Sequence, residues 1–342
     1  MRGIVLILMG LIFILLVTKA PILTILTEPM SNQERRALEA LKVTGAQVRE
    51  LDWWEVRDLL AEIAAKGYQL KIGSQEVKVP LLFPVKGSLR AFSPFFKEYI
   101  NYVEVSIHSQ ELLLALDTGS PFTTLTPRSA IEQKLPISIE FRPKREIKYY
   151  AVPIFLGEGS IKVGQAEVTS VPIIINQSNV RAKLLNIPIW HHTGTLGFDI
   201  LSQFSSVTID YPSRVFILRH QDLEYDPKVG AIELPLRIFK FRPLVDAYLN
   251  GKGPFPFLFD TGPSTKNLLV APQIAVELGF VGRVSKLRLE KVKIGELLLE
   301  SHEAEVILLP KEQEFLGIIP RGLFSSYRVT IDFKKQLIFF EG

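Results

Sequence analysis

The stretch LLLALDTGSPFTTLTP (Leu112–Pro127) places an aspartate, Asp117, at the end of an apolar run. A second stretch, FPFLFDTGPSTKNLLV (Phe255–Val270), does the same with Asp260. A carboxylate in an apolar setting is costly unless a partner or a chemical task compensates for it. Because the same Asp-Thr-Gly follows an apolar run twice, we interpret the two stretches as two halves of one site.

The two stretches begin an internal repeat. In each copy a Pro-led helical turn, a variable β region, a Leu-Gly pair, a Phe-Ser-Ser and a closing Val-Thr-Ile-Asp strand follow in the same order. The distance from the aspartate to the Leu-Gly glycine is 80 residues in the first copy (197 minus 117) and 57 in the second (317 minus 260). This order of landmarks predicts two lobes that share a frame. Two unrelated strand-end turns would not explain it.

The composition excludes several classes of protein. The chain has 342 residues with 47% hydrophobic and 22% charged residues, which is typical of a globular protein. Its net charge of +4 is spread along the sequence, so we expect no nucleic-acid partner. The absence of cysteine excludes disulfides, thiolate metal sites and a cysteine nucleophile. The histidines lack metal-ligand spacing, and adjacent His191 and His192 predict a structural loop, so we expect neither metal nor cofactor.

The N-terminus predicts a membrane segment. Residues Gly3 to Val17 carry no polar side chain, and apolar character resumes as far as Leu26. A cleaved signal peptide and an uncleaved anchor both fit, but the small-residue cleavage pattern is poor, which favours an anchor over residues 1–27. Arg2 and the terminal amine favour the N-terminus inside. We therefore expect a single-pass, membrane-anchored protein with its body outside the cytoplasm, in the periplasm or at the cell surface.

The rest of the chain divides into a helical segment and an all-β body. Ser31 and Glu34 have the spacing of a capping box, and residues 28–70 are predicted to form a helical stalk. From about Lys71 onward, short β-rich runs alternate with Gly, Pro, Asn and Ser. The predicted lobes are residues 71–225 and residues 226–342.

Two carboxylates brought within hydrogen-bond reach cannot both ionise easily, so the pair shares one proton. The ionised member can take a proton from water while the protonated member donates to a carbonyl oxygen, which is acid–base hydrolysis without a metal. Gly119 and Gly262 would let the backbone approach the carboxylates. Thr118 and Thr261 supply hydroxyls that can be buried only if they are hydrogen-bonded.

The motifs LDTGS and FDTGP, each followed by a hydrophobic-Leu-Gly element, resemble the two half-sites of the pepsin–retropepsin aspartic proteases, over about residues 95–342. The resemblance implies an all-β, bilobal fold of two retropepsin-like barrels in one chain, as in membrane-anchored bacterial members. It implies that Asp117 and Asp260 form the catalytic dyad, with Thr118 and Thr261 bonding across the lobe interface. The other implied site residues are Gly119, Ser120, Gly262 and Ser264 beside the dyad, and Leu196, Gly197, Leu316 and Gly317 packed behind it.

The second half-site departs from the family pattern. Pro263 stands where a hydroxyl residue is common, with Ser264 next to it. The segment Ile147–Gly164 suits a substrate-covering hairpin, with Gly157 and Gly159 near its tip. The first hypothesis is an aspartic endopeptidase acting on an extended peptide, with both half-sites in one chain, so that no oligomer is required. The alternative is a non-catalytic module that keeps the bilobal cleft to bind a peptide or protein.

Overall fold

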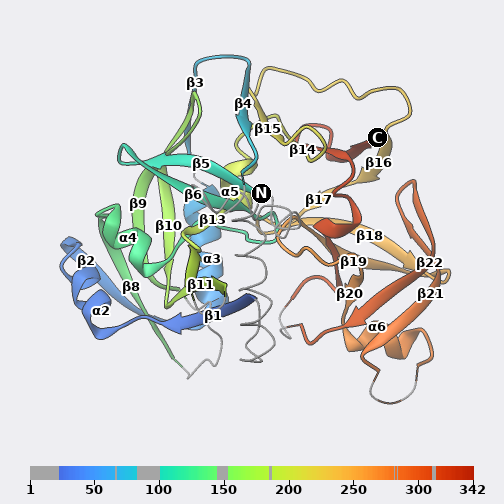
Figure 1. Ribbon diagram of the computed structural model, residues 1–342, viewed down its shortest axis with the longest axis horizontal. Coiled ribbons are helices and arrows are strands. Elements are labelled where there is room, and N and C mark those ends of the chain that lie inside the picture. The colour runs from blue at the N-terminus through green and yellow to red at the C-terminus, as the bar shows by residue number, and fades with distance from the viewer. Residues whose placement is uncertain are drawn as a thin grey trace, which may run out of the picture.

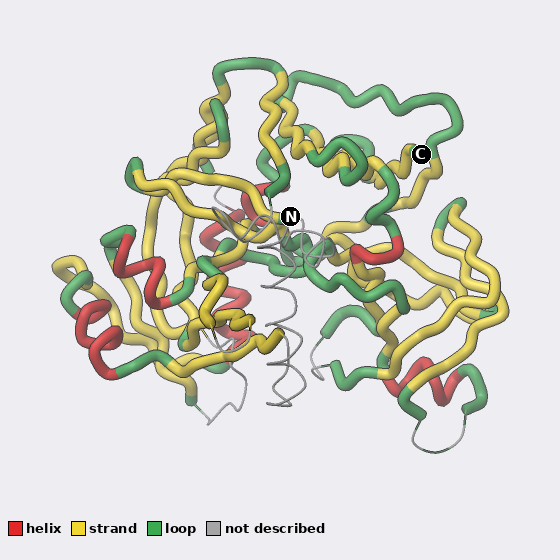
Figure 2. The backbone as a smooth tube through the Cα atoms, viewed as in Figure 1, coloured by secondary structure: helices red, strands yellow, loops and turns green. Residues whose placement is uncertain are grey.

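Strands outnumber helices among the described residues of the computed structural model (Figure 1), and most helices are short connections between strands (Figure 2). The predicted all-β class is therefore confirmed. The structure describes residues 23–65, 68–82, 101–144, 153–184, 187–280, 282, 284–309 and 313–342.

The first lobe contains a closed ring of six strands. Each strand pairs with the next, and β9 pairs with both β10 and β5, which closes the ring. In pairing order the strands are β5 (Tyr102–Ile107), β6 (Gln110–Leu116), β13 (Gly194–Leu196), β7 (Thr124–Leu125), β10 (Ala166–Asn176) and β9 (Pro153–Val163). β8 (Ile137–Pro143) extends the sheet beyond β9.

The second lobe repeats this ring. Here β21 pairs with both β22 and β18 and closes the barrel. In the corresponding order the strands are β18 (Pro243–Leu249), β19 (Lys252–Asp260), β23 (Gly317–Pro320), β20 (Leu268–Val270), β22 (Leu297–Val306) and β21 (Lys286–Ile294). β17 (Arg237–Ile238) extends the sheet beyond β18.

The predicted repeat is confirmed by strand order and direction. The strand before each Asp-Thr-Gly, β6 or β19, pairs in parallel with β13 or β23, respectively. The two Pro-led turns are helices α4 (Pro127–Glu132) and α6 (Pro272–Glu277), at the bounds that the sequence predicts. Proline suits the first helical position, where its missing N–H has no acceptor to lose. Short helices also follow the parallel strands, α5 (Phe198–Leu201) and η2 (Arg321–Leu323).

Hydrophobic alternation places the core inside each barrel. In β21, Leu287, Leu289, Val292 and Ile294 are buried while the lysines between them are exposed. Fully burying one such side chain stabilises the fold by about 1.5–3 kcal/mol. β19 is instead apolar on both faces from Phe257 to Phe259, because it lies under the site and inside the lobe interface.

A six-stranded sheet joins the lobes, along the top of Figure 1. Its central strands, β14 (Ser206–Asp210) and β24 (Arg328–Asp332), are the two Val-Thr-Ile-Asp segments, paired antiparallel. Thr208 lies opposite Thr330, and their hydroxyl oxygens are 2.7 Å apart. The approximate twofold axis that relates the two lobes therefore passes between these two threonines. The outer strands are β15 (Val215–Arg219), β4 (Glu76–Pro80), β25 (Leu337–Glu341) and β16 (Ile232–Pro235).

The expected helical stalk over residues 28–70 is wrong. The capping box at Ser31 and Glu34 is present, but the segment also contains two strands of the first lobe's sheet. β2 pairs in parallel with β8, and β3 pairs antiparallel with β10. The backbone N–H and C=O groups of β8 and β10 pair with those of β2 and β3, and this pairing outweighs the helical preference of the local sequence. The elements are α2 (Asn32–Glu39), β2 (Lys42–Leu51), α3 (Trp53–Ala65) and β3 (Gln69–Ile72).

The expected anchor over residues 1–27 falls mostly outside the described residues. From Leu23 onward the chain is a strand instead, because β1 (Leu23–Pro29) pairs along its whole length with β11 (Ser178–Leu184). β11 pairs in turn with β12 (Ile187–His191). Within the described ranges, none of the helices has both the length and the apolar side chains that a membrane crossing requires.

Candidate active site

The structure brings Asp117 and Asp260 together at the lobe interface. Asp117 directly follows β6, and Asp260 ends β19. A methyl group built on Gly119 would lie 2.4 Å from the carboxyl carbon of Asp260, and one built on Gly262 would lie 3.0 Å from Oδ1 of Asp117. Each glycine therefore packs on the carboxyl group of the opposite lobe, and a side chain would clash severely at Gly119 and more mildly at Gly262.

The two threonines of the motifs lock the lobes to each other. The backbone N–H of Thr118 donates to the Thr261 hydroxyl over 3.0 Å, and the N–H of Thr261 donates to the Thr118 hydroxyl over 3.1 Å. Each hydroxyl also donates across the interface, to the carbonyl of Phe259 (2.7 Å) or of Leu116 (3.1 Å). Both threonines are fully buried, and every polar group in this square is paired.

Backbone amides hold the carboxylates unequally. Oδ1 of Asp117 accepts from the N–H groups of Gly119 (3.0 Å) and Ser120 (3.2 Å). Oδ1 of Asp260 accepts from Gly262 (2.8 Å), but the next residue is Pro263, which has no N–H to donate. The departure at Pro263 therefore removes an amide donor from Asp260.

The hydroxyls that follow the motifs have other roles than the sequence suggests. Ser120 Oγ donates to the carbonyl of Phe122 over 2.8 Å, so only its amide serves Asp117. Among the described contacts, the Ser264 hydroxyl makes no hydrogen bond to either aspartate. Ser264 instead lies behind the loop, where its carbonyl would be 2.5 Å from a methyl group on Gly322.

The environment of Asp260 favours its protonated form. The residue is only 7% exposed, and burial raises the pKa of its carboxyl well above the ordinary value. The negative charge of Asp117 and a hydrogen bond between the two side chains raise this pKa further, while the amides of Gly262 and Gly119 oppose the shift. The pair is therefore arranged to hold one proton between two carboxyl groups.

A glycine packs against each active-site loop, at Gly197 in the first lobe and at a residue other than Gly317 in the second. Gly197 lies under the first active-site loop, since a methyl group there would be 2.4 Å from the backbone of Phe122. Leu196 beside it is fully buried. In the second lobe, strand pairing places Pro320 opposite Asp260. Gly317 lies opposite Phe257, three residues before the aspartate, so the second Leu-Gly pair is not next to its aspartate.

Pro320 is the counterpart of Gly197 in strand register, and the glycine that packs against the second active-site loop is Gly322. A methyl group on Gly317 would meet the Phe257 ring at 2.3 Å, inside the barrel. One on Gly322 would meet the carbonyl of Thr265 at 2.1 Å, five residues after Asp260, as Phe122 is five after Asp117. Matching Leu-Gly by letter thus gives the wrong equivalence, and Leu316 only packs against the core from a half-buried position.

A cavity of about 450 Å³ opens beside Asp117. Sequence reasoning missed two of its walls, Thr27 from β1 and His192, which was expected to have only a loop role. Burial lowers the pKa of His192 to about 4, so its imidazole is neutral near pH 7. The lining residues are Thr27, Asp117, Ser120, Pro121, Phe122, Thr124, Thr126, Ile174, Asn176, Ser178, Val180, His192 and Thr195.

Two buried polar residues that the sequence did not single out support the site. The Asn101 amide donates to the carbonyl of Thr261 over 2.9 Å, and also to that of Leu116, which links the two active-site loops. Asp199 is fully buried and accepts from the hydroxyls of Tyr68 (3.1 Å) and Thr123 (2.9 Å). Burial raises the pKa of Asp199 to about 6. Its one signal in the sequence is an acid in the apolar run GFDIL, directly after the Leu-Gly pair.

The two glycines expected near the tip of a covering hairpin lie elsewhere. Gly157 and Gly159 lie inside β9, where Gly157 packs against Leu135, and are not at a tip. The connection between β8 and β9, with Tyr149 and Tyr150, lies outside the described residues. In the described part of the chain, no three His, Asp or Glu side chains gather closely enough to hold a metal ion.

Comparison with known proteins finds a partial likeness to solved structures. No protein-family model and no curated protein sequence matches the chain. A solved structure of a retropepsin-like aspartic protease from Rickettsia conorii matches with 20% sequence identity and a TM-score of 0.25; the match covers 34% of this chain and 95% of that one. At this identity and TM-score the match establishes no activity for this chain.

Proposed function

We propose that this protein is an aspartic endopeptidase that hydrolyses peptide bonds between Asp117 and Asp260. The observation that carries the proposal is the pair of opposed, hydrogen-bonded carboxyl groups, one of them with a raised pKa. The ionised member accepts a proton from the attacking water, and the protonated member donates to the peptide carbonyl oxygen. The two apparent pKa values belong to the pair, so neither role is assigned to one residue.

The surroundings of the pair suit this chemistry. The hydrogen-bonded square of Thr118 and Thr261 keeps the two loops from sliding past each other, and Gly119 and Gly262 bring the carboxyl groups close. Positioning of this kind lowers a barrier because no reorganisation is needed during the reaction. Both halves of the site come from one chain, so no oligomer is needed to complete it.

The proposed substrate is an extended peptide or protein segment with an apolar side chain next to the cleaved bond. The cavity beside Asp117 has apolar walls at Phe122, Ile174 and Val180 and polar groups at its edge. Apolar pockets with a few polar groups bind side chains by desolvation and orient them by hydrogen bonds. A membrane tether through the apolar residues Gly3 to Val17, with the body outside the cytoplasm, is also part of the proposal.

The test is to compare the wild-type protein with Asp117→Asn and Asp260→Asn on a peptide library across pH. Each variant is expected to lose at least about 10³-fold in kcat/KM, because an amide cannot replace the shared proton. Asp246→Asn is the matched control, since Asp246 is an exposed residue of β18 that pairs with Arg237. Circular dichroism and thermal unfolding check that each variant is folded.

Either dyad variant retaining the wild-type rate would refute the shared-proton mechanism. Peptide binding without cleavage by the folded wild-type protein at every pH would instead favour the alternative, a non-catalytic peptide-binding module. Pro263 gives a reason to test for binding without cleavage, because it lacks the N–H that could donate to Asp260.

A further inference from the structure

Helix α3 precedes the first barrel in sequence and is packed on it. Its residues Val56, Leu60 and Ala64 are buried, and the helix lies against β10 and β2. Glu55 in its first turn pairs with Lys144 at the end of β8, with 2.7 Å between Oε1 and Nζ. The helix is therefore a fixed part of the first lobe.

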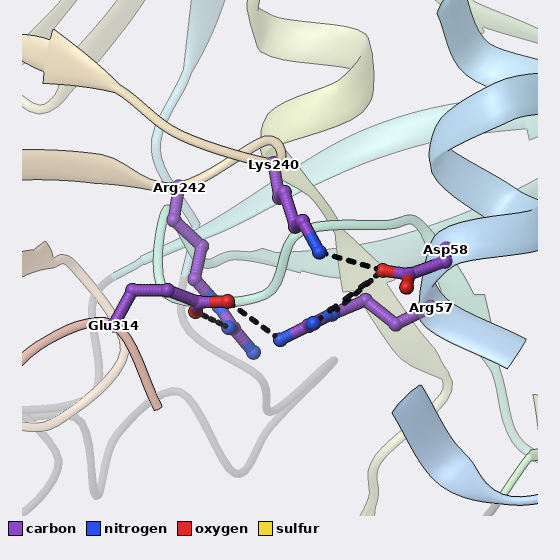
Figure 3. Close-up of polar contacts among 5 residues, drawn as sticks. All are labelled: Arg57, Asp58, Lys240, Arg242 and Glu314. Atoms are coloured by element: carbon purple, nitrogen blue, oxygen red, sulfur yellow. Dashed lines mark hydrogen bonds and ion pairs between the residues drawn. The ribbon is translucent and has the colours of Figure 1, made fainter. Parts of the chain in front are cut away.

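The same helix reaches the second lobe through a buried ionic contact (Figure 3). Glu314 lies between two guanidinium groups, with Oε1 2.9 Å from Arg57 Nη1 and Oε2 3.2 Å from Arg242 Nη1. The side chains of Arg57 and Arg242 are only 8% and 6% exposed. Removing this carboxylate would take from each buried guanidinium its closest anionic partner among the described residues.

A second contact lies beside the first. Lys240 Nζ is 2.8 Å from Asp58 Oδ1, and Arg57 Nη2 is 3.4 Å from the same oxygen. Asp58 is half exposed, so this pair alone would contribute little. Together with Glu314 it forms one connected network in which two residues of α3 hold three residues of the second lobe (Figure 3).

The network holds a turn in an unfavourable backbone conformation. Residues 239–242 connect β17 to β18, with N–H···O bonds of 3.0 Å in both directions between Phe239 and Arg242. The two central residues, Lys240 and Phe241, have φ of 47° and 58°. A turn of this type prefers Asn-Gly, because other side chains are strained at positive φ. Such a conformation persists where the surrounding structure holds it in place.

The turn contacts the cavity wall beside Asp117 and lies near a buried cluster that contains Leu258. The Phe241 ring lies 5.7 Å from that of Phe122, which lines the cavity beside Asp117. The Arg242 guanidinium lies 5.7 Å from the Phe315 ring, and Phe315 packs in a buried cluster with Leu258, two residues before Asp260. A shift of the turn would therefore disturb the surroundings of both aspartates.

We infer that α3 acts as a clamp that positions the turn 239–242 against Phe122 and so sets the width of the substrate cleft. The inference rests on the proposed function. The members of this α3 clamp are positioning residues, which act through the turn and not on the substrate. They are Arg57, Asp58, Lys240, Arg242 and Glu314.

Replacing Glu314 with glutamine tests the clamp at its centre. The change removes the carboxylate between Arg57 and Arg242 and leaves Arg57 only its longer contact with Asp58, so the turn should loosen. The aspartates remain held by Thr118 and Thr261, so binding should suffer more than chemistry. The matched control is Glu132→Gln, which breaks an exposed 2.9 Å pair with Arg128 inside one helix of the first lobe.

Two readouts separate positioning from general destabilisation. Hydrogen exchange at the Phe239 and Arg242 amides should become at least about tenfold faster in Glu314→Gln and stay unchanged in Glu132→Gln. KM for a peptide substrate should rise about fivefold or more, with kcat within about twofold of wild type, since cleft width affects binding first. Added salt should raise the wild-type KM in the same direction.

A milder pair of variants covers the case in which Glu314→Gln does not fold. Asp58→Asn should show the same two effects to a smaller degree, and the charge swap Asp58→Lys with Lys240→Asp should reverse part of them, because it restores the pair between positions 58 and 240 but not the contact of Arg57 with a carboxylate. Unchanged exchange in folded variants, faster exchange with unchanged KM, or failure of the swap would each overturn the clamp. If the wild-type protein cleaves no peptide, the proposed function fails, and amide exchange alone decides whether α3 holds the turn.

Discussion

A single methyl group at Gly119 would push the two proposed catalytic carboxyl groups apart. Built on the Gly119 backbone, it lies 2.4 Å from the Asp260 carboxyl carbon, whereas ordinary contact begins at 3.4 Å. Relief of the clash requires a displacement of about 1.0 Å (3.4 minus 2.4). Asp260 is buried, and its neighbour Thr261 is hydrogen-bonded to the other lobe. The displacement should therefore increase the distance between the carboxyl groups of Asp117 and Asp260.

Gly119→Ala is therefore expected to lower kcat on the order of 100-fold, the usual consequence of misplacing a reacting group by 1 Å. Gly262→Ala is the informative comparison, since its methyl group would lie 3.0 Å from Oδ1 of Asp117, a shortfall of only 0.4 Å (3.4 minus 3.0). Asp117 is only partly buried and can yield, so this variant should lose less than about tenfold. Neither glycine has a positive φ, so backbone strain does not add to either effect.

The assay measures kcat and KM on one cleaved peptide, with thermal unfolding of each variant. Gly73→Ala serves as the control, because a methyl group there meets only the Gln165 side chain at 3.8 Å. Activity of Gly119→Ala within threefold of wild type, or a larger loss in Gly262→Ala, would refute the claim that Gly119 sets the spacing of the pair.

Two further predictions concern stability. Because burial raises the pKa of Asp199 from 3.8 to about 6, Asp199 should contribute a fall of about 3 kcal/mol in the free energy of unfolding as pH rises from about 4 to above 6. This contribution is the difference between wild type and Asp199→Asn, because the lowered pKa of His192 acts in the opposite direction in both proteins. Asp199→Asn should lack this fall in urea titrations at pH 4 and pH 7; equal pH slopes would contradict the assignment. Thr118→Val and Thr261→Val should each cost about 2 kcal/mol or more, since each leaves buried groups of the other lobe unpaired. The double variant should cost less than the sum in denaturant titrations, and full additivity would argue against one connected square.

Features that depend on neighbouring residues in the chain could be predicted from the sequence. The capping box at Ser31 and the Pro-led helices α4 and α6 lie where predicted, because a cap or an N-terminal proline acts within one turn. The duplicated Asp-Thr-Gly also predicted two matching barrels, since a repeated order of strands and turns folds into a repeated unit.

Features that depend on distant partners were missed. β1 and β2 are strands only because β11 and β8 offer them backbone partners more than ninety residues away in the chain. Strand register makes Pro320, and not Gly317, the counterpart of Gly197, which the repeated Leu-Gly letters conceal. His192 lines the cavity with residues that are distant in sequence, such as Thr27 and Asp117, so its position there could not be predicted from its neighbours in the chain.

The sequence by itself determined that this chain has two Asp-Thr-Gly half-sites on apolar strands, in two lobes of one design. Only the tertiary structure decided how the halves meet: the crossed threonine bonds, the glycines under the opposite carboxyl groups, and the ionic network that ties α3 to the second lobe. The physical reason is range. Helix caps, turns and hydrophobic periodicity are encoded within a few residues, whereas the pKa of Asp260 and the shape of the cleft depend on groups more than a hundred residues apart, whose distance is set by packing.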